Sequence, residues 1–208
     1  MVERELPLFP LNVVLFPGMR LPLHIFEERY KLMIGTCMVT DQTFGVALIR
    51  SGSEVGGPAE VHAVGTTARI LTVDRLPEGR MNLVAVGVDR FRLLERLHDQ
   101  PYARGRVALL PDDTQPSAAA LAGQVSRKLT RYLVARGAPA DRVRSLELPS
   151  EPLALSYLVA ALLKAPVEQR QRLLEAPSVA ARLRQELALL EWETGGPPQL
   201  NARSFSLN

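Results

Sequence analysis

One glycine-rich segment of the chain approaches the spacing of two catalytic motifs. Gly52 and Gly57 stand five residues apart, as in the P-loop that cradles the phosphates of ATP. The next two residues are Pro58 and Ala59, where that motif needs a lysine and a hydroxyl residue. A serine nucleophile elbow needs one residue between glycine and serine, but Ser53 follows Gly52 directly. We interpret the segment as a loop and expect neither ATP hydrolysis nor serine catalysis.

Residues that commonly bind metals or transfer protons are scattered through the rest of the chain. His24, His62 and His98 lie far apart in the sequence, and Cys37 is the single cysteine. These residues do not have the spacing of a metal-binding motif. The acidic pair Glu27-Glu28 opens a predicted helix, where carboxylates favour the positive end of the helix dipole. We therefore predict no catalytic residue, no cofactor and no metal site, and we interpret the protein as not an enzyme.

Composition indicates a globular protein of ordinary type. The chain has 208 residues, 47% of them hydrophobic and 23% charged, with a formal net charge of +3. Its longest apolar run, Pro152–Leu163, is too short for the roughly 18 residues that span a bilayer. The N-terminus, with Glu3 and Glu5, lacks the features of a signal peptide, and a lone cysteine fits a reducing compartment. These observations favour a soluble cytoplasmic protein with no membrane partner.

The elements that would position any site fall into two halves. Residues 1–111 contain short runs rich in valine, isoleucine, leucine and phenylalanine between turn signals such as Pro17-Gly18, which is typical of strands. The predicted strands are Leu6–Phe9, Asn12–Phe16, Arg20–Ile25, Thr43–Arg50, Glu60–Val73, Arg80–Leu97 and Ala103–Leu110. One helix is predicted among them, over Phe26–Val39. Gly65 and Gly87 lie inside predicted strands, where glycine often marks a bulge or bend of a curved sheet.

Residues 112–194 have helical periodicity instead. Apolar residues recur every three to four positions from Leu121 to Leu133, and Gly137 provides a stop. Leu153–Lys164 is apolar nearly all round, which predicts a helix in the middle of a bundle. A short third helix begins at Pro166, and Ser178 caps a fourth that reaches Trp192. Residues 195–208 are predicted to form a flexible tail.

The N-terminal segment Leu6–Tyr30 resembles the opening of the Lon protease N-terminal domain family. Its sequence contains PLFPL, then VLFPG, then LPLHIFE, in the order of that family's first strands and first helix. Three later segments, Phe44–Ile49, Val64–Ile70 and Val84–Phe91, resemble the strands that follow. The resemblance implies an α+β fold, in which a PUA-like β pseudo-barrel is followed by an α-helical bundle. The chain resembles a stand-alone version of that domain, without the ATPase motor and the peptidase of the full proteases.

That resemblance also implies the function and the partner. We expect a non-catalytic module that binds an unfolded or extended polypeptide, or a partner protein, with a link to proteolysis or quality control. Phe16, Met19 and His24 flank the Pro17-Gly18 turn and are the candidate binding residues, with core packing as the alternative reading for each. The cleft between barrel and bundle, at the connection 111–116, is a second candidate surface.

The alternative function is RNA binding, because PUA-like barrels also occur in proteins that recognise RNA. One stretch of the second half is strongly basic and contains Arg127, Lys128, Arg131, Arg136, Arg142 and Arg144 against Asp141 alone. A solvated helix face whose cations meet acids elsewhere is the simpler interpretation, and the barrel half offers few aromatics for base stacking. A nucleic-acid partner is therefore not expected, and the sequence predicts no particular oligomeric state.

Overall fold

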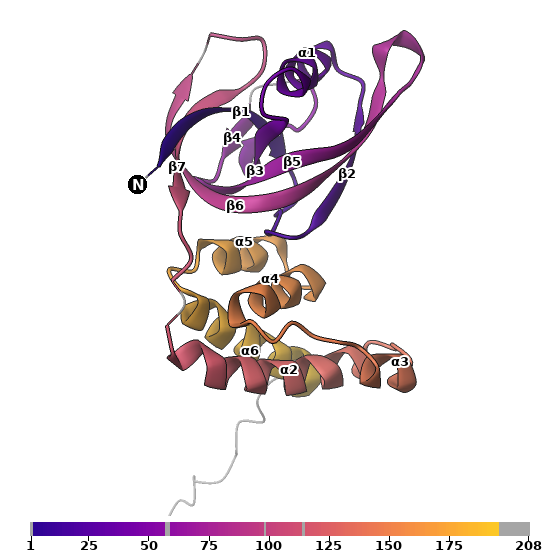
Figure 1. Ribbon diagram of the computed structural model, residues 1–208, viewed down its shortest axis with the longest axis vertical. Helices are drawn as coiled ribbons and strands as arrows, with labels where there is room; N and C mark the ends of the chain where they lie inside the picture. The colour runs from indigo at the N-terminus through magenta and orange to yellow at the C-terminus, as the bar shows by residue number, and fades with distance from the viewer. Residues whose placement is uncertain (1, 57–58, 98, 114, 196–208) are drawn as a thin grey trace, which may run out of the picture.

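A curved sheet lies at one end of the molecule and a group of helices at the other (Figure 1). This computed structural model describes residues 2–56, 59–97, 99–113 and 115–195. The strands are β1 (Glu3–Leu11), β2 (Arg20–Ile25), β3 (Thr43–Gly52), β4 (Ala59–Val61), β5 (Val64–Arg75), β6 (Met81–Leu97) and β7 (Arg104–Leu110). The helices are α1 (Glu28–Met38), α2 (Ser117–Ala135), α3 (Ala140–Arg144), α4 (Pro152–Leu162), α5 (Val167–Glu175) and α6 (Val179–Gly195), with a 3-10 turn at Pro77–Gly79.

The sheet closes on itself through β1. Its first part, Glu3–Pro7, pairs antiparallel with β7, and its second part, Leu8–Leu11, pairs parallel with β3. The ring is completed by β7–β6, β6–β5 and β5–β3 pairs, while β2 pairs with β6 and β4 with β3 outside it. Register shifts in β5, β6 and β7 pairing supply the bends that closure needs. The predicted fold class, a β pseudo-barrel followed by a helical bundle, is confirmed.

Two strand glycines permit close backbone contacts inside this barrel. A Cβ atom at Gly65 would lie 2.4 Å from the carbonyl oxygen of Val46, and one at Gly87 would lie 2.3 Å from that of Phe16. Gly65 also precedes a register shift between Thr66 and Ala68. Only glycine leaves room for these approaches, so both positions fit the predicted sharp bends.

The predicted strand Asn12–Phe16 is absent, and the chain runs there without regular structure. Val14, Leu15 and Phe16 are all buried, whereas a half-buried strand would alternate. Leu15 packs into the core of the barrel with α1, while Val14 and Phe16 pack into the core shared with the bundle. The segment is apolar because it passes between two cores.

The structure differs from the predicted elements in two further details. The predicted strand Glu60–Val73 is divided into β4 and β5 at His62-Ala63, because β4 pairs only with the end of β3. Helix α3, of five residues, was not predicted, since it is too short to show periodicity.

The helical half is built around α4 and α6. Helix α2 ends at Ala135, two residues before Gly137, whose φ of 89° matches the predicted stop. The Ser178 hydroxyl accepts from the backbone N–H of Ala181 at 3.2 Å, which confirms the predicted cap of α6. Helix α4 buries Leu155 and Val159 in contact with α2 and α6, but Ala154 and Leu162 are exposed, so this apolar helix is less completely buried than predicted.

No helix within the described residues is long and apolar enough to span a membrane. The division into independent units at residue 111 stays a prediction, and the predicted tail lies outside the described residues beyond Gly195.

Candidate polypeptide-binding groove

A groove of about 450 Å³ separates the barrel from the exposed face of α4. We call it the barrel–bundle groove. Its barrel wall is formed by the turn Pro17–Met19 and by Val88-Asp89 of β6, and its opposite wall by α4 residues between Leu153 and Ala161. Asp112, in the connection between the two halves, lies at its base. The cleft that the sequence suggested near residues 111–116 is therefore a real concavity of the structure.

The barrel wall is fixed by hydrogen bonds to a glycine. The backbone N–H of Gly18 donates to Gly87 O at 2.9 Å, and Gly87 N–H donates to Met19 O at 3.0 Å. Gly18 has φ of 80°, a left-handed conformation that suits glycine. Because Gly87 has no side chain, the turn can lie directly on β6, and this contact places Met19 at the rim beside Val88.

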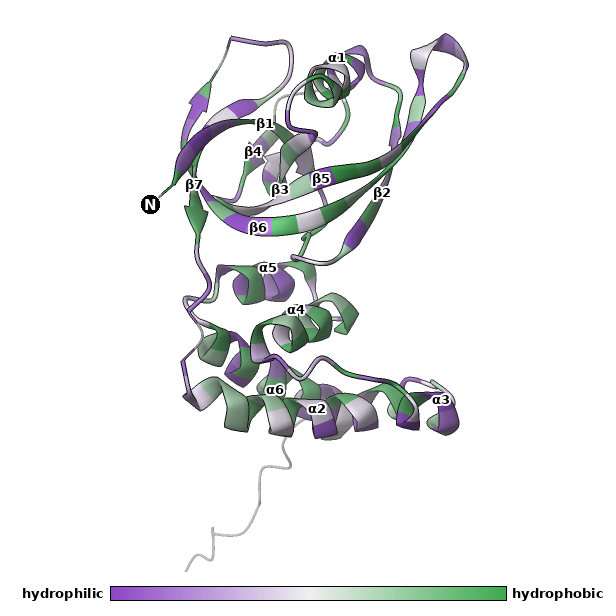
Figure 2. Cartoon of the chain, in the orientation of Figure 1, coloured by the Kyte–Doolittle hydropathy of each residue, from purple (hydrophilic) through white to green (hydrophobic). Residues whose placement is uncertain are grey.

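The bundle wall is an apolar helix face that the rest of the protein leaves partly exposed. Ala154, Leu158 and Ala161 lie at positions i, i+4 and i+7, which fall on one side of a helix. Ala154 is exposed, and Leu158 and Ala161 are half-buried. Hydrophobic residues dominate the whole of α4 (Figure 2), so it presents apolar surface to the groove as well as to the core.

Carboxylates mark the edges of this apolar surface. The Glu151 carboxylate caps α4 by accepting from the N–H groups of Leu153 (3.2 Å) and Ala154 (2.8 Å). Asp89 is exposed on the barrel wall. Together with Asp112 they are the charged groups among the described lining residues, where lysine and arginine are missing.

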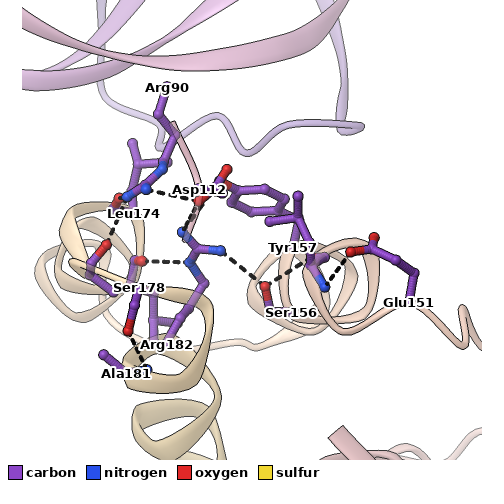
Figure 3. Close-up of polar contacts among 12 residues, drawn as sticks. Arg90, Asp112, Glu151, Ser156, Tyr157, Leu174, Ser178, Ala181 and Arg182 are labelled. Atoms are coloured by element: carbon purple, nitrogen blue, oxygen red, sulfur yellow. Dashed lines mark hydrogen bonds and ion pairs between the residues drawn. The ribbon is translucent and has the colours of Figure 1, made fainter. Parts of the chain in front are cut away.

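A buried polar network lies directly behind the groove (Figure 3). Asp112 accepts from Arg90 of β6 at 2.8 Å, from Arg182 of α6 at 3.1 Å and from the Tyr157 hydroxyl of α4 at 2.5 Å. The two arginine side chains are 3% and 0% exposed, so this is an interior ion-pair cluster. It joins the barrel, the connection and two helices at one carboxylate.

Other donors of this network are directed to backbone and hydroxyl oxygens, while Arg90 Nε has no hydrogen-bond partner among the described residues. Arg90 Nη1 donates to Leu174 O and Ala176 O, both at 2.8 Å, at the C-terminal end of α5. Arg182 donates to Leu173 O at 3.0 Å and to the Ser156 hydroxyl at 3.0 Å. These carbonyls are the negative end of a helix dipole, which stabilises the two cations.

Two buried groups with raised pKa values complete the interior. Burial raises the pKa of Tyr157, so its hydroxyl keeps its proton and donates it to Asp112. Burial also raises the pKa of Glu186 well above its ordinary value, although nearby Arg182 acts in the opposite direction. Within the described residues, neither carboxylate oxygen of Glu186 has a hydrogen-bond partner. Asp112 binds Arg90, Arg182 and Tyr157, so this part of the interior resembles a structural lock between the two halves.

The structure separates the three candidate binding residues. Phe16 is 0% exposed in the shared core, with the Arg170 guanidinium 5.5 Å from its ring centroid, so it cannot contact a ligand without loss of packing. Met19 lies in the barrel–bundle groove. His24 is exposed near the other end of β2, where its Nδ1 lies 2.7 Å from Asn82 Oδ1, and it lines a different hollow. Met19 is the candidate that the groove retains.

The other motifs of the sequence are accounted for structurally. The glycine-rich segment leads from β3 to β4, with Gly57-Pro58 outside the described residues, so no helix N-terminus follows as a phosphate site would need. Three cations of the basic stretch meet acids: Lys128 with Glu191 (3.1 Å), Arg136 with Glu193 (3.8 Å) and Arg144 with Asp141 (2.7 Å). This is the solvated helix face that the sequence suggested.

A second hollow, of about 440 Å³, lies near the start of α1 and the β6–β7 connection. Its polar groups are already engaged: Arg96 donates to Ala59 O at 2.9 Å, and Arg104 pairs with Glu5 at 2.7 Å. The barrel–bundle groove differs because its apolar wall on α4 includes the exposed Ala154 and the half-buried Leu158 and Ala161.

Comparison with known proteins identifies the family. The sequence model of the ATP-dependent protease La (LON) substrate-binding domain matches residues 5–191. Lon protease 2 of Myxococcus xanthus is 32% identical over 195 residues, which are 91% of this chain and 24% of the relative. The Lon protease of Anaeromyxobacter dehalogenans is 31% identical over 198 residues. The chain thus spans about a quarter of the length of these relatives, and it matches their substrate-binding part.

Solved structures agree. The Lon N-terminal domain protein from Xanthomonas campestris is 30% identical, with a TM-score of 0.66 over 89% of this chain and 98% of that one. The N-terminal domain of a Lon protease from the Mycobacterium avium complex has a TM-score of 0.70 over 93% and 100% of the two chains, at 21% identity, which shows likeness of fold. The resemblance seen in Leu6–Tyr30 is therefore confirmed, and the chain belongs to the Lon substrate-binding domain family.

Proposed function

We propose that the barrel–bundle groove holds extended segments of unfolded polypeptide, and that the protein recognises polypeptides without acting on them chemically. The observation that carries the proposal is the partly exposed apolar face of α4 opposite Met19 and Val88, in a chain of the substrate-binding family. An unfolded segment exposes the apolar side chains that such a face would remove from water.

The chemistry of the walls suits loose recognition of many sequences. Burying one leucine- or phenylalanine-sized side chain contributes about 1.5–3 kcal/mol, which favours weak and rapidly reversible binding. Met19 supplies a flexible thioether that adapts to side chains of different shape. The opposite wall, by contrast, is held by a capped helix, so the groove keeps its form while its rim adjusts.

The proposal assigns no catalytic role to the described residues. Among the described residues, the buried ionisable groups around Asp112 bind one another and backbone carbonyls, apart from the Arg90 Nε, which has no hydrogen-bond partner. A role in proteolysis or quality control, as in the relatives named Lon protease, would consist of presenting a bound polypeptide. A cytoplasmic location stays a prediction from the sequence.

The test is binding of a fluorescently labelled, permanently unfolded protein, such as reduced and carboxymethylated α-lactalbumin, measured by anisotropy. Ala154→Trp places a large side chain on the exposed wall of the groove, and Ala120→Trp places it on an exposed position of α2. We expect Ala154→Trp to weaken binding at least tenfold and Ala120→Trp to leave it unchanged. Equal binding by both variants would remove the groove from the proposal.

The same assay distinguishes RNA binding. A labelled structured RNA should bind weakly and lose its affinity as salt rises toward physiological strength, because contacts to phosphates release counterions. Tight RNA binding that survives this salt, and is lost on Arg127→Ala with Arg131→Ala, would favour the RNA alternative.

A further inference from the structure

We propose that the barrel–bundle groove prefers polypeptide segments in which an apolar side chain is flanked by lysine or arginine. This inference rests on the proposed function and deepens it, because the apolar walls explain binding and the acidic edges would set its sequence preference. Asp89 and Glu151 carry that preference from opposite walls of the groove.

The Glu151 carboxylate is held by hydrogen bonds, whereas Asp89 is fixed through its backbone and its carboxylate is left exposed. Glu151 is tied to the first turn of α4 through the N–H groups of Leu153 and Ala154, so its charge stays at the mouth of the groove. The backbone N–H of Asp89 donates to the Thr67 hydroxyl at 3.0 Å, which fixes the strand beneath it. Among the described residues, Asp89 has no ion pair, so its charge is open to a ligand.

The third carboxylate of the groove is already neutralised. Asp112 is bound by Arg90 and Arg182, and both arginines also donate to carbonyls at the C-terminal end of α5. Among the described lining residues, the exposed charges of the groove are therefore the two edge acids. A lysine or arginine beside the docked apolar residue would meet one of them, whereas an acidic neighbour would be repelled.

The size of the effect follows from the exposure of these acids. Exposed ion pairs are weak and screened by salt, so each should change affinity by about two- to fivefold at low ionic strength. The preference for flanking lysine or arginine selects among apolar segments, while the apolar contacts supply most of the affinity. It should fade when salt rises, while the apolar contribution persists.

The experiment uses three labelled peptides that share a central phenylalanine in a glycine–serine background and differ in its two neighbours. These neighbours are lysine, serine or glutamate, and anisotropy is followed up to millimolar protein. We expect the lysine peptide to bind about four- to tenfold more tightly than the serine peptide at 20 mM salt, and the glutamate peptide to bind least. At 0.5 M salt the lysine and serine peptides should differ by less than about twofold.

Matched variants assign the preference to the groove. Asp89→Asn combined with Glu151→Gln should abolish the difference between lysine and serine peptides, measured as the ratio of their two affinities, because a change in the cap of α4 would alter both affinities together. The control, Asp74→Asn combined with Glu147→Gln, removes two exposed acids outside the groove and should keep the difference.

The outcomes separate this inference from the proposed function. Equal affinity of all three peptides, with binding still lost in Ala154→Trp, would overturn the charge preference and keep the groove. A lysine preference that survives Asp89→Asn with Glu151→Gln would place the selecting acids elsewhere. Peptide binding that Ala154→Trp does not weaken would overturn both.

Discussion

Phe16 and Met19 are three residues apart on one turn and differ in burial, since Met19 is half-buried and packs against both cores. Phe16 is fully buried between barrel and bundle, while Met19 lies at the rim of the barrel–bundle groove. The turn is anchored by Gly87, so its first side chain points into the shared core and its last reaches the surface. One apolar motif thus holds the two halves together and contributes to a candidate binding surface.

The acidic residues around the barrel–bundle groove also differ in exposure. Asp112 is enclosed by two arginines and a tyrosine and serves the interior. Asp89 and Glu151, on the groove walls, remain exposed. Interior residues should therefore affect folding, and groove residues should affect binding, which the following changes can test.

Phe16→Ala should have the largest effect on stability. Removing a fully buried aromatic side chain costs about 3–5 kcal/mol of unfolding free energy. Phe16→Leu keeps most of the volume and should cost less than about 1.5 kcal/mol. Chemical denaturation measures both, with the exposed Phe26→Ala as a control that loses little. A small loss for Phe16→Ala would mean that this side chain is not in the core.

Asp112→Asn should destabilise the protein by a similar amount, about 3–5 kcal/mol, because it leaves the buried cations Arg90 and Arg182 without their carboxylate. The adjacent exposed acid provides the matched control, and Asp113→Asn should change the unfolding free energy by less than about 0.5 kcal/mol. If the two variants unfold alike, the network is not the lock that joins the halves.

Met19→Ala should affect binding more than stability, in contrast to Phe16→Ala. Its side chain is partly exposed, so the loss of stability should be about 1 kcal/mol or less, while affinity for an unfolded polypeptide should fall about fivefold or more. Anisotropy and denaturation on the same samples give both values. Unchanged affinity in a stable variant would leave Met19 outside the binding surface.

Glu186→Gln should change how stability depends on pH. Burial raises the pKa of Glu186 in the folded protein above its value of about 4.5 in the unfolded chain. Below about pH 4.5 the group is protonated in both the folded and the unfolded state, so its burial costs no ionisation energy. As pH rises from there toward the folded pKa, the unfolded chain releases the proton first, and the free energy of unfolding falls. The variant cannot ionise, so its stability relative to the natural protein should increase over that range. Denaturation at several pH values checks this, and a constant difference would show that Glu186 is not protonated in the interior.

The sequence predicted the barrel strands well where apolar and polar residues alternate between turn signals, as in Arg20–Ile25. It misassigned Asn12–Phe16, because side chains buried by two different cores produce the same apolar run as a strand. For the site, the motif around Pro17-Gly18 led to Met19 but could not separate it from Phe16. The apolar composition of α4 predicted complete burial, and only the tertiary structure shows that one of its faces is partly exposed.

The charged residues of the site were not predicted. Asp89, Asp112 and Glu151 come from a strand, a connection and a helix cap, and no sequence spacing links them. Their proximity depends on how α4 packs against the barrel. Two sequence features could have suggested this surface. They are the apolar helix α4 with a carboxylate at its first turn, and the apolar turn Pro17–Met19.

The most direct measurement of the central claim follows the methionine methyl groups of the protein labelled with ¹³C-methyl methionine. Met19 reports on the groove, Met38 is exposed at the end of α1, and Met33 is buried in the barrel. On titration with reduced and carboxymethylated α-lactalbumin, we predict that the Met19 resonance shifts or broadens while those of Met38 and Met33 stay in place. A Met19 signal that is unaltered at saturation, or a response confined to Met38, would contradict recognition of polypeptide by the barrel–bundle groove.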